Sequence, residues 1–186
     1  MVMSLFSKIL GFFYSSAKTP DPPQISGSDE YFIHPLRIDR LDEVVKLNAR
    51  CFSKGENYNH QTFGFLLNDS RNISYMAVNE SGTMIGFIFI MRAHDDSGHI
   101  TTIGVAPECR RKGLAKRLLD HAEEVLRKKG FSSVALEVRI SNHAAQELYL
   151  QSDYMIVQTL KSYYNDGEDG YLMMKALEVW EEEFTR

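Results

Sequence analysis

The sequence predicts an α+β fold in which a mixed β-sheet carries helices on its faces. Apolar runs with strand-like and helix-like spacing follow one another in the order β-α-α-β-β-β-α-β-α-β-β. Two β-rich runs at 73–79 and 84–93 flank turn residues at 80–83, which indicates an antiparallel hairpin. A strand, a helix and another strand fill 98–140, which implies a parallel pair joined by a right-handed crossover.

The first half of the chain contains a strand, two helices and the hairpin. The run 31–38 is β-rich, and 39–52 has apolar residues at helical spacing with Asp39 as the expected N-cap. A short second helix is expected at about 61–68. After the hairpin, the run 98–107 reads as a strand that Pro107 ends.

The second half contains the most regular patterns. The helix that follows Gly113 has one apolar stripe and stops at Gly130, a residue type that commonly ends helices. The strand at 131–140 alternates strictly, with Glu137 on its polar face. A helix is expected at 141–152. The remaining elements are strands at 153–164 and 171–177 around a turn, and a short C-terminal helix at 178–184.

Length and composition bound the possible functions. The chain has 186 residues, 44% of them hydrophobic and 25% charged, which suits one soluble globular domain. Its net charge of −4 argues against bulk binding to nucleic acid. Its two cysteines, Cys51 and Cys109, lack metal-type spacing and are compatible with a reducing compartment. No apolar run is long enough to span a membrane.

We expect three regions along the chain: an extension at 1–30, a domain at 31–177 and a C-terminal helix or tail at 178–186. Residues 15–30 have the composition of a linker. Ahead of them, apolar residues at helical spacing predict either a short amphipathic helix, which would dock on the domain, a partner or a membrane surface, or a loosely packed extension. They are Leu5, Phe6, Ile9, Leu10 and Phe13.

The stretch "CRRKGLAKRLL" at 109–119 places three cations at the start of a helix, where the helix dipole disfavours them. A bound anion would remove the conflict, because the first-turn N–H groups and the cations would then share one negative ligand. A solvated basic helix end explains the same residues. The stretch is neither a Walker loop nor a dinucleotide fingerprint.

The longer stretch "VAPECRRKGLAKRLLDHA" resembles the acetyl-CoA-binding signature of the GNAT acetyltransferases, Gln/Arg-x-x-Gly-x-Gly/Ala. Arg110, Gly113 and Ala115 fill this pattern. The resemblance extends over 31–177 and implies the GNAT fold. That fold is an α/β/α sandwich whose mixed, mostly antiparallel sheet contains two splayed parallel strands.

Four more stretches resemble the amino-terminal acetyltransferases, namely "GHITTIGV", "LEVRISNHAAQELY", "SYYNDGEDGYLM" and "GENYN". They are most similar to the archaeal and eukaryotic NatA catalytic subunits and to the bacterial ribosomal-protein alanine acetyltransferase. "GENYN" lacks the proline usual in that group. The resemblance implies transfer of acetyl from acetyl-CoA to the α-amino group of a protein N-terminus, in the cytoplasm, with an auxiliary subunit or the ribosome as potential partners. A small amine or a lysine as the acceptor, and a non-catalytic acetyl-CoA-binding module, are the alternatives.

The resemblance also assigns cofactor contacts. The backbone of Ile103, Gly104 and Val105 would pair with the pantetheine arm. Asn142 would contact the cofactor, although an asparagine there also suits a helix N-cap. Tyr149 would protonate the departing thiolate, or it is simply a core aromatic residue. The pyrophosphate loop would comprise Arg110, Arg111, Lys112, Gly113, Leu114, Ala115 and Lys116.

On the acceptor side, Glu137 would act as a general base on the incoming ammonium, although a solvated strand face is the simpler explanation of the residue alone. His99 would share a water with it. Two ligands make a weak zinc site, so we expect no metal. The loop residues Glu56 and Tyr58 would cover the first residue of the substrate, with Glu56 as a second candidate base. Tyr163 and Tyr164 would hold its backbone from the other side, or they pack as ordinary β-rich residues.

Overall fold

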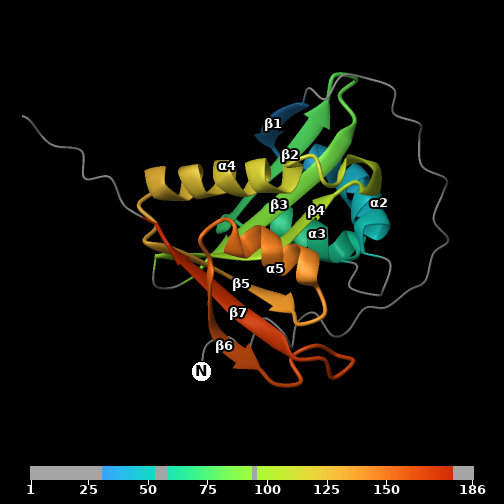
Figure 1. Cartoon of the computed structure of the whole chain (residues 1–186). Helices are drawn as coiled ribbons and strands as arrows, with labels where there is room; N and C mark the ends of the chain where they lie inside the picture. Colours follow the sequence, from blue (N-terminus) through green and yellow to red (C-terminus); the bar gives the residue numbers. More distant parts are fainter. Residues whose placement is uncertain (1–30, 53–57, 94–95, 178–186) are drawn as a thin grey trace, which may run out of the picture.

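The computed structural model describes residues 31–52, 58–93 and 96–177. Its centre is a seven-stranded sheet in the order β1-β2-β3-β4-β5-β7-β6 (Figure 1). Neighbouring strands are antiparallel except for β4 and β5, which are parallel. The strands are β1 (Tyr31–Pro35), β2 (Asn72–Asn79), β3 (Met84–Arg92), β4 (Ser97–Val105), β5 (Ser133–Arg139), β6 (Met155–Leu160) and β7 (Gly170–Ala176).

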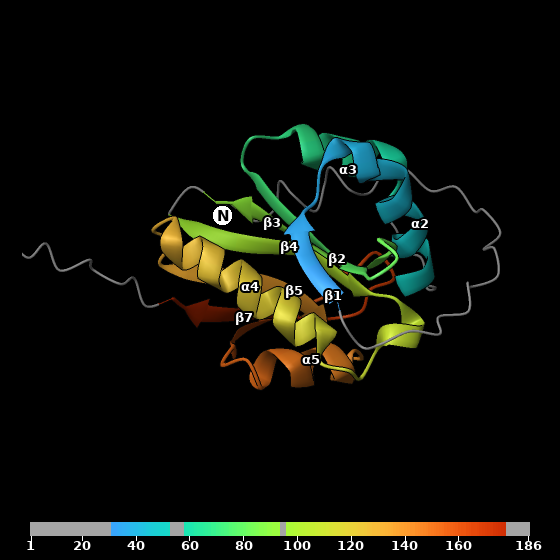
Figure 2. The same ribbon diagram turned by 90° about the horizontal axis from the view of Figure 1, so that it is seen from above.

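Helices cover both faces of the sheet, so that the molecule has three layers (Figure 2). The helices α2 and α3 lie on one face, and α4 and α5 lie on the other. This arrangement confirms the predicted α/β/α sandwich and the predicted element order. The helices are α2 (Leu41–Cys51), α3 (His60–Asn68), α4 (Leu114–Lys128) and α5 (His143–Leu150), with 3₁₀ turns η2 (Ile38–Arg40) and η3 (Pro107–Cys109).

The parallel strands β4 and β5 remain paired only at their beginnings. Their register runs from Ser97–Ser133 to His99–Ala135. Beyond these residues β4 stays bound to β3, and β5 stays bound to β7. The second half of β4 therefore presents a backbone edge that has no partner strand on the β5 side. This divergence is the splay that the resemblance implied.

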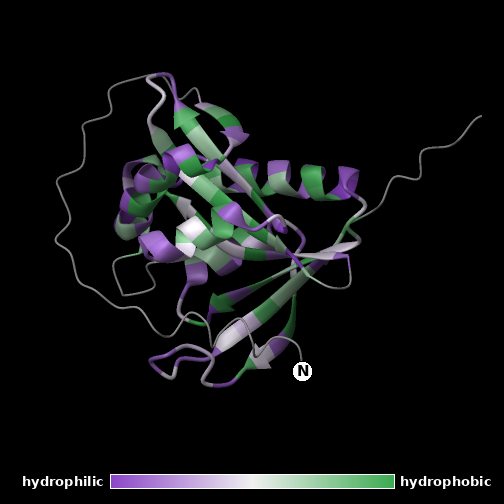
Figure 3. Cartoon of the chain, turned by 180° about the vertical axis from the view of Figure 1, so that it is seen from behind, coloured by the Kyte–Doolittle hydropathy of each residue, from purple (hydrophilic) through white to green (hydrophobic). Residues whose placement is uncertain are grey.

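The core lies on both faces of the sheet, between the central strands and α4 on one side and α2 and α3 on the other. Figure 3 shows hydrophobic residues along these strands and an alternation of hydrophobic and hydrophilic residues along α4. Leu118 is fully buried and sits over Gly86 of β3, where an added Cβ would come 2.9 Å from the leucine Cδ1. Close packing of this kind sets the position of α4, and with it the position of the loop before it.

Three expectations about this part of the fold are wrong. Asp39 does not cap α2; it lies inside η2, and the residue before α2 is Arg40, whose side chain makes no capping hydrogen bond. The first strand ends at Pro35 rather than at 38, because after Leu36, whose N–H still donates to Ser74, the chain turns into η2 at Ile38. Glu123, expected on the polar side of α4, is only 2% exposed and pairs with Lys175 and Arg127.

None of the helices in the described ranges is long and apolar enough to cross a membrane. The expected extension at 1–30 and the expected tail at 178–186 lie outside these ranges.

Candidate active site

A carboxylate and an imidazole meet where β4 and β5 begin to diverge. The strand β5 buries alternate residues, and this alternation places Glu137 on the other face. The side chain of Glu137 is nevertheless only 9% exposed, because its Oε2 lies 2.7 Å from Nε2 of His99 on β4. With Glu137 ionised, the hydrogen lies on Nε2 and the carboxylate accepts it. The strand register explains the contact, since His99 is opposite Ala135, two residues before Glu137.

Tyr58 and Tyr163 bring two phenol groups to this carboxylate from separate loops. The Tyr58 hydroxyl donates to the backbone oxygen of Thr101 over 3.2 Å, and burial together with the charge of Glu137 raises the pKa of Tyr58 to about 12. Burial, Glu137 and Tyr58 likewise raise the pKa of Tyr163 far above its usual value. Both phenols therefore stay protonated at neutral pH and can donate hydrogen bonds.

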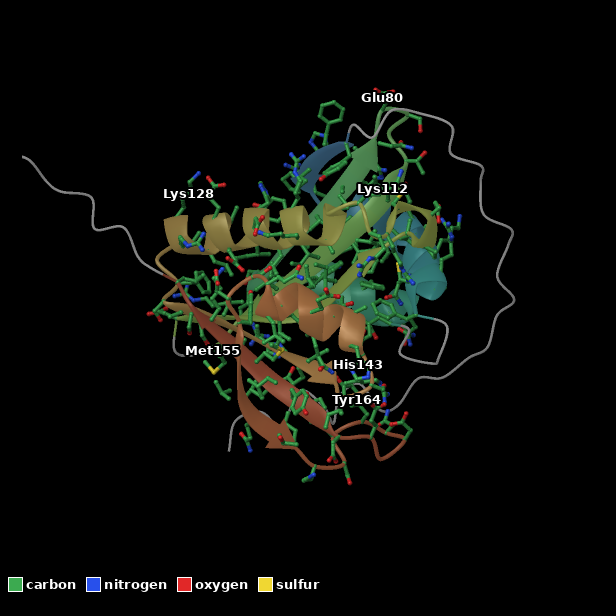
Figure 4. The ribbon with its side chains drawn as sticks, in the orientation of Figure 1. Glu80, Lys112, Lys128, His143, Met155 and Tyr164 are labelled. Carbon is green, nitrogen blue, oxygen red and sulfur yellow. The ribbon has the colours of Figure 1, made fainter. Side chains whose placement is uncertain are left out.

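Tyr164 completes the aromatic wall beside Tyr163. The two rings meet edge to face, with centroids 5.1 Å apart. Tyr164 lies on the loop between β6 and β7, at the same end of the sheet as His143, the first residue of α5 (Figure 4). Burial raises the pKa of Tyr164, and the neighbouring Tyr163 raises it further. The predicted tyrosine pair is thus placed next to the predicted base.

Asn142 and Tyr149 are positioned by α5. The Asn142 side chain accepts a hydrogen bond from the backbone N–H of Ala145 over 3.2 Å, so it is the N-cap of the helix. Tyr149 is 5% exposed and packs on Tyr154 with ring centroids 5.6 Å apart. Burial raises the pKa of Tyr149 strongly, which keeps its phenol protonated. Both simpler explanations, the cap and the core aromatic, are correct, and neither conflicts with a role toward a ligand.

The start of α4 has the backbone geometry that an anion needs. Gly113 adopts φ +78°, a left-handed conformation, and an added Cβ there would meet nothing within 4 Å. No side chain caps this end, and the first intrahelical bond comes from the N–H of Arg117. The N–H groups of the first turn thus have no helical partner. Together with the unpaired edge of β4 that carries Ile103, Gly104 and Val105, these groups fit a ligand with a pyrophosphate and an amide-bearing arm.

The cations before α4 differ from one another in their contacts. Arg110 points inward, and its guanidinium donates to the backbone oxygens of Cys51 (2.9 Å) and Val105 (3.3 Å). Arg111 is largely exposed, and its Nη1 lies 3.7 Å from a Glu147 carboxylate oxygen. Lys112 lies at the start of α4, opposite the Lys128 end (Figure 4). Lys116, within the first turn, pairs with Asp120. Arg110 therefore ties α2 to β4 and leaves the loop backbone free for an anion.

Three further points concern residues that the site described above does not include. Glu56 lies outside the described residues, so the structure does not place it. Among the residues that are placed, no group of three or more potential ligands could hold a metal ion. Sequence reasoning overlooked Arg139, which shares the strand face of Glu137 and contacts the tyrosine loop. Its position two residues after Glu137 was the available signal, because alternate residues of a strand share a face.

The sandwich combines two diverging parallel strands, an uncapped helix start beside them and a carboxylate–imidazole pair between them, an arrangement suited to acyl transfer. The profile of the acetyltransferase (GNAT) family matches residues 41–154, and the chain belongs to this family. It is accordingly an acetyl-transferring enzyme whose acetyl donor is acetyl-CoA.

Individual proteins are similar to the chain over most of its length. The N-alpha-acetyltransferase daf-31 of Caenorhabditis elegans is 33% identical, with coverage of 80% of this chain and 85% of the relative. An N-alpha-acetyltransferase of Saccharolobus solfataricus is 30% identical, with coverage of 80% and 94%. The crystal structure of the ribosomal-protein-S18-alanine N-acetyltransferase of Escherichia coli superposes with a TM-score of 0.74 at 26% identity, covering 84% of this chain and 100% of that chain.

Proposed function

We propose that the protein transfers acetyl from acetyl-CoA to the α-amino group of a peptide or protein N-terminus. The observation that carries this proposal is the Glu137–His99 pair, which is enclosed by Tyr58 and Tyr163 from two different loops. The names of the relatives in C. elegans and S. solfataricus support the same acceptor class.

The chemistry requires removal of one proton before the amine can attack. A chain α-amino group has a pKa of about 8, so most of it is ammonium at neutral pH. Glu137, oriented by the His99 hydrogen bond, accepts this proton directly or through a water. The amine nitrogen then forms a bond to the thioester carbonyl carbon, the carbon–sulfur bond breaks, and the nitrogen gives its second proton to the phenolate that is left when Tyr149 protonates the sulfur.

Two further groups of the chain serve the departing thiolate and the carbonyl. Tyr149, kept protonated by burial, donates its phenol proton to the sulfur. The unpaired N–H groups on the edge of β4 near Val105 polarise the thioester carbonyl, as oxyanion donors do. The cofactor phosphates bind the first-turn N–H groups of α4, assisted by Arg111, Lys112 and Lys116. No enzyme nucleophile is needed, and the pKa of Cys51, which burial raises to about 11, makes its thiol a poor one.

The two tyrosine-bearing loops distinguish a chain end from a small amine. A free amine needs only the base, whereas a peptide also offers backbone N–H and C=O groups that protonated phenols can bind. Tyr163 and Tyr164 reach Glu137 from the loop between β6 and β7, and Tyr58 reaches it from the loop before α3. This enclosure favours an acceptor that continues as an extended chain beyond its amino group.

An acetyl-CoA turnover assay tests the proposal directly. The acceptors are peptides beginning with Ser, Ala, Met-Leu and Glu, with free lysine and a polyamine as competitors. We expect turnover of at least one peptide class, with kcat/KM well above that of either free amine. Turnover confined to the free amines would refute the proposal. Adding ribosomes to the same assay tests the expected ribosomal partner.

A further inference from the structure

Arg139 contacts several side chains of the β6–β7 loop, which spans 161–169. Its Nη1 lies 2.9–3.0 Å from both carboxylate oxygens of Asp166 and 2.7 Å from an oxygen of Glu168. Its guanidinium carbon stacks 3.9 Å from the centroid of the Tyr164 ring. The side chain is only 16% exposed. Arg139 on β5 therefore holds the loop both by ion pairs and by stacking on an aromatic ring.

Two aromatic rings connect Arg139 to the candidate base Glu137. Arg139 lies on Tyr164, the edge of Tyr164 meets Tyr163, and Tyr163 interacts with Glu137. Arg139 and Glu137 are two residues apart on the same face of β5, so one strand carries both the base and the anchor of the wall beside it. Glycine at 170 permits this closeness, because an added Cβ would come within 3.2 Å of the Tyr164 ring.

The other bonds of the loop do not replace Arg139. Glu168 also accepts from the backbone N–H of Ser141, and Asp169 accepts from Ser162 and Lys161. These bonds hold the two ends of the loop. Within it, the Tyr164 N–H donates to the backbone oxygen of Glu168 over 3.1 Å and the Gly167 N–H donates to the backbone oxygen of Tyr164 over 2.9 Å, so backbone bonds close the turn while Arg139 holds the side chains of Asp166, Glu168 and Tyr164. Without the guanidinium, the carboxylates of Asp166 and Glu168 would repel each other beside the tyrosines, and the Tyr164 ring would lose the face it packs on.

We propose that Arg139 is a positioning residue for the acceptor peptide. It holds Tyr163 and Tyr164 against the site of the amine without touching the reacting atoms, and so it sets the affinity for peptides rather than the rate of the chemical step. This inference rests on the proposed function. A lysine would keep the charge but would lose the planar fork and most of the stacking, so it is not equivalent at this position.

The test compares R139A and R139K with the wild-type protein in the peptide assay. R139A loses charge-assisted hydrogen bonds, so we expect its peptide KM to rise by about tenfold or more. R139K keeps the charge but loses the planar fork, so a substantial part of this rise in KM should also be seen in R139K. The kcat at saturating peptide, the KM for acetyl-CoA and the kcat/KM for a small free amine should each stay within about threefold. An unchanged peptide KM in both variants, or a fall in kcat alone, overturns the proposal.

A matched control excludes a general loss of structure. Arg92 makes the same two kinds of contact outside the β6–β7 loop, an ion pair of 2.6 Å with Asp96 and a cation–π contact of 5.4 Å with Phe131. R92A should therefore leave the peptide KM unchanged. Thermal melting of R139A and R139K identifies any variant that does not fold, and a folded R139K keeps the test decisive.

A double-mutant cycle with Tyr164 shows whether the effect passes through the ring. If Arg139 acts by holding this ring, R139A adds little to the peptide KM once Tyr164 is replaced by leucine. Fully additive effects contradict the proposed path. A wild-type protein that turns over no peptide would overturn the proposed function and this inference together. Peptide turnover by the wild type with an unaltered KM in R139A and R139K would overturn this inference alone.

Discussion

Replacement of Glu137 by glutamine isolates the role of the candidate base. Glutamine keeps the size of the side chain and can still bond to His99 Nε2, so the strand and its neighbours should keep their places. It cannot take a proton from an ammonium group. General-base assistance contributes about 10²–10⁴-fold to a rate, which equals about 3–5 kcal/mol of barrier. We therefore expect kcat at pH 7 to fall by at least about a hundredfold, with the peptide KM little changed.

The pH dependence of the variant makes the prediction sharper. With an amine pKa of about 8, the neutral fraction of the peptide is about one tenth at pH 7 and about nine tenths at pH 9. If the only role of Glu137 is to remove this proton, the variant needs the base less at high pH, where most of the amine is already neutral. The rate of E137Q should then rise about tenfold between these pH values, more steeply than the wild-type rate does.

Steady-state kinetics at pH 7 and pH 9, with acetyl-CoA saturating, measure both effects. The matched control is E124Q, which removes the charge of an exposed carboxylate that is paired with Lys128 on α4. E124Q should match the wild type at both pH values. Full activity of E137Q at pH 7 would refute the assignment of the base. A defect that appears only in the peptide KM would make Glu137 a binding group instead.

Three further predictions concern the cofactor loop, the core and the acceptor loop. Gly113→Ala should lower the free energy of unfolding by about 1–2 kcal/mol because the φ of Gly113 is +78°, and it should weaken acetyl-CoA binding. Gly130 has the same φ at the other end of α4, so Gly130→Ala should lower the free energy of unfolding equally and leave the dissociation constant for acetyl-CoA unchanged. Both are measured by calorimetric titration and by the melting shift with acetyl-CoA. Leu118→Ala should lower the free energy of unfolding in urea by about 3 kcal/mol, because the leucine is fully buried against the sheet; a loss below 1 kcal/mol would show that the site collapses or is looser than described. Arg139 holds the pKa of Asp166 below its usual value, so the loop contacts that they share are fully present above about pH 4 and are lost as the pH falls through that lowered pKa. Hydrogen exchange of the loop at pH 6 and at about pH 2, corrected for the intrinsic exchange rates, should show stronger protection at the higher pH.

The sequence predicted correctly those features of the site that depend on residues close together along the chain. The apolar stripe after Gly113 predicted α4 and its start next to this glycine, because a helix start with unpaired N–H groups depends on neighbours along the chain. The alternation around Glu137 predicted its face correctly, because the side-chain period of a strand is a local property. Asn142 was expected as an N-cap for the same reason. The start of α2 was misjudged, since the η2 turn before it made a capping Asp39 unnecessary.

Longer-range chemistry was not accessible from spacing. The resemblance suggested that His99 and Glu137 act together, but their 2.7 Å contact depends on the parallel register of two strands separated by a whole helix. Nothing in the composition of α4 marked Glu123 as buried, because its partner Lys175 comes from the last strand.

The sequence by itself determined the order of the elements, the Gly113 turn that is the candidate phosphate site and the face of the candidate base, since each depends on residues within about one turn or one strand. Only the tertiary structure decided that Arg110 bonds inward to Cys51 and Val105 instead of facing an anion, and that Arg139 grips the loop of Tyr164. The physical reason is that a guanidinium is long, and it pairs with whatever carbonyl, carboxylate or ring the fold brings within reach. That choice is made in space, between residues as much as 59 positions apart.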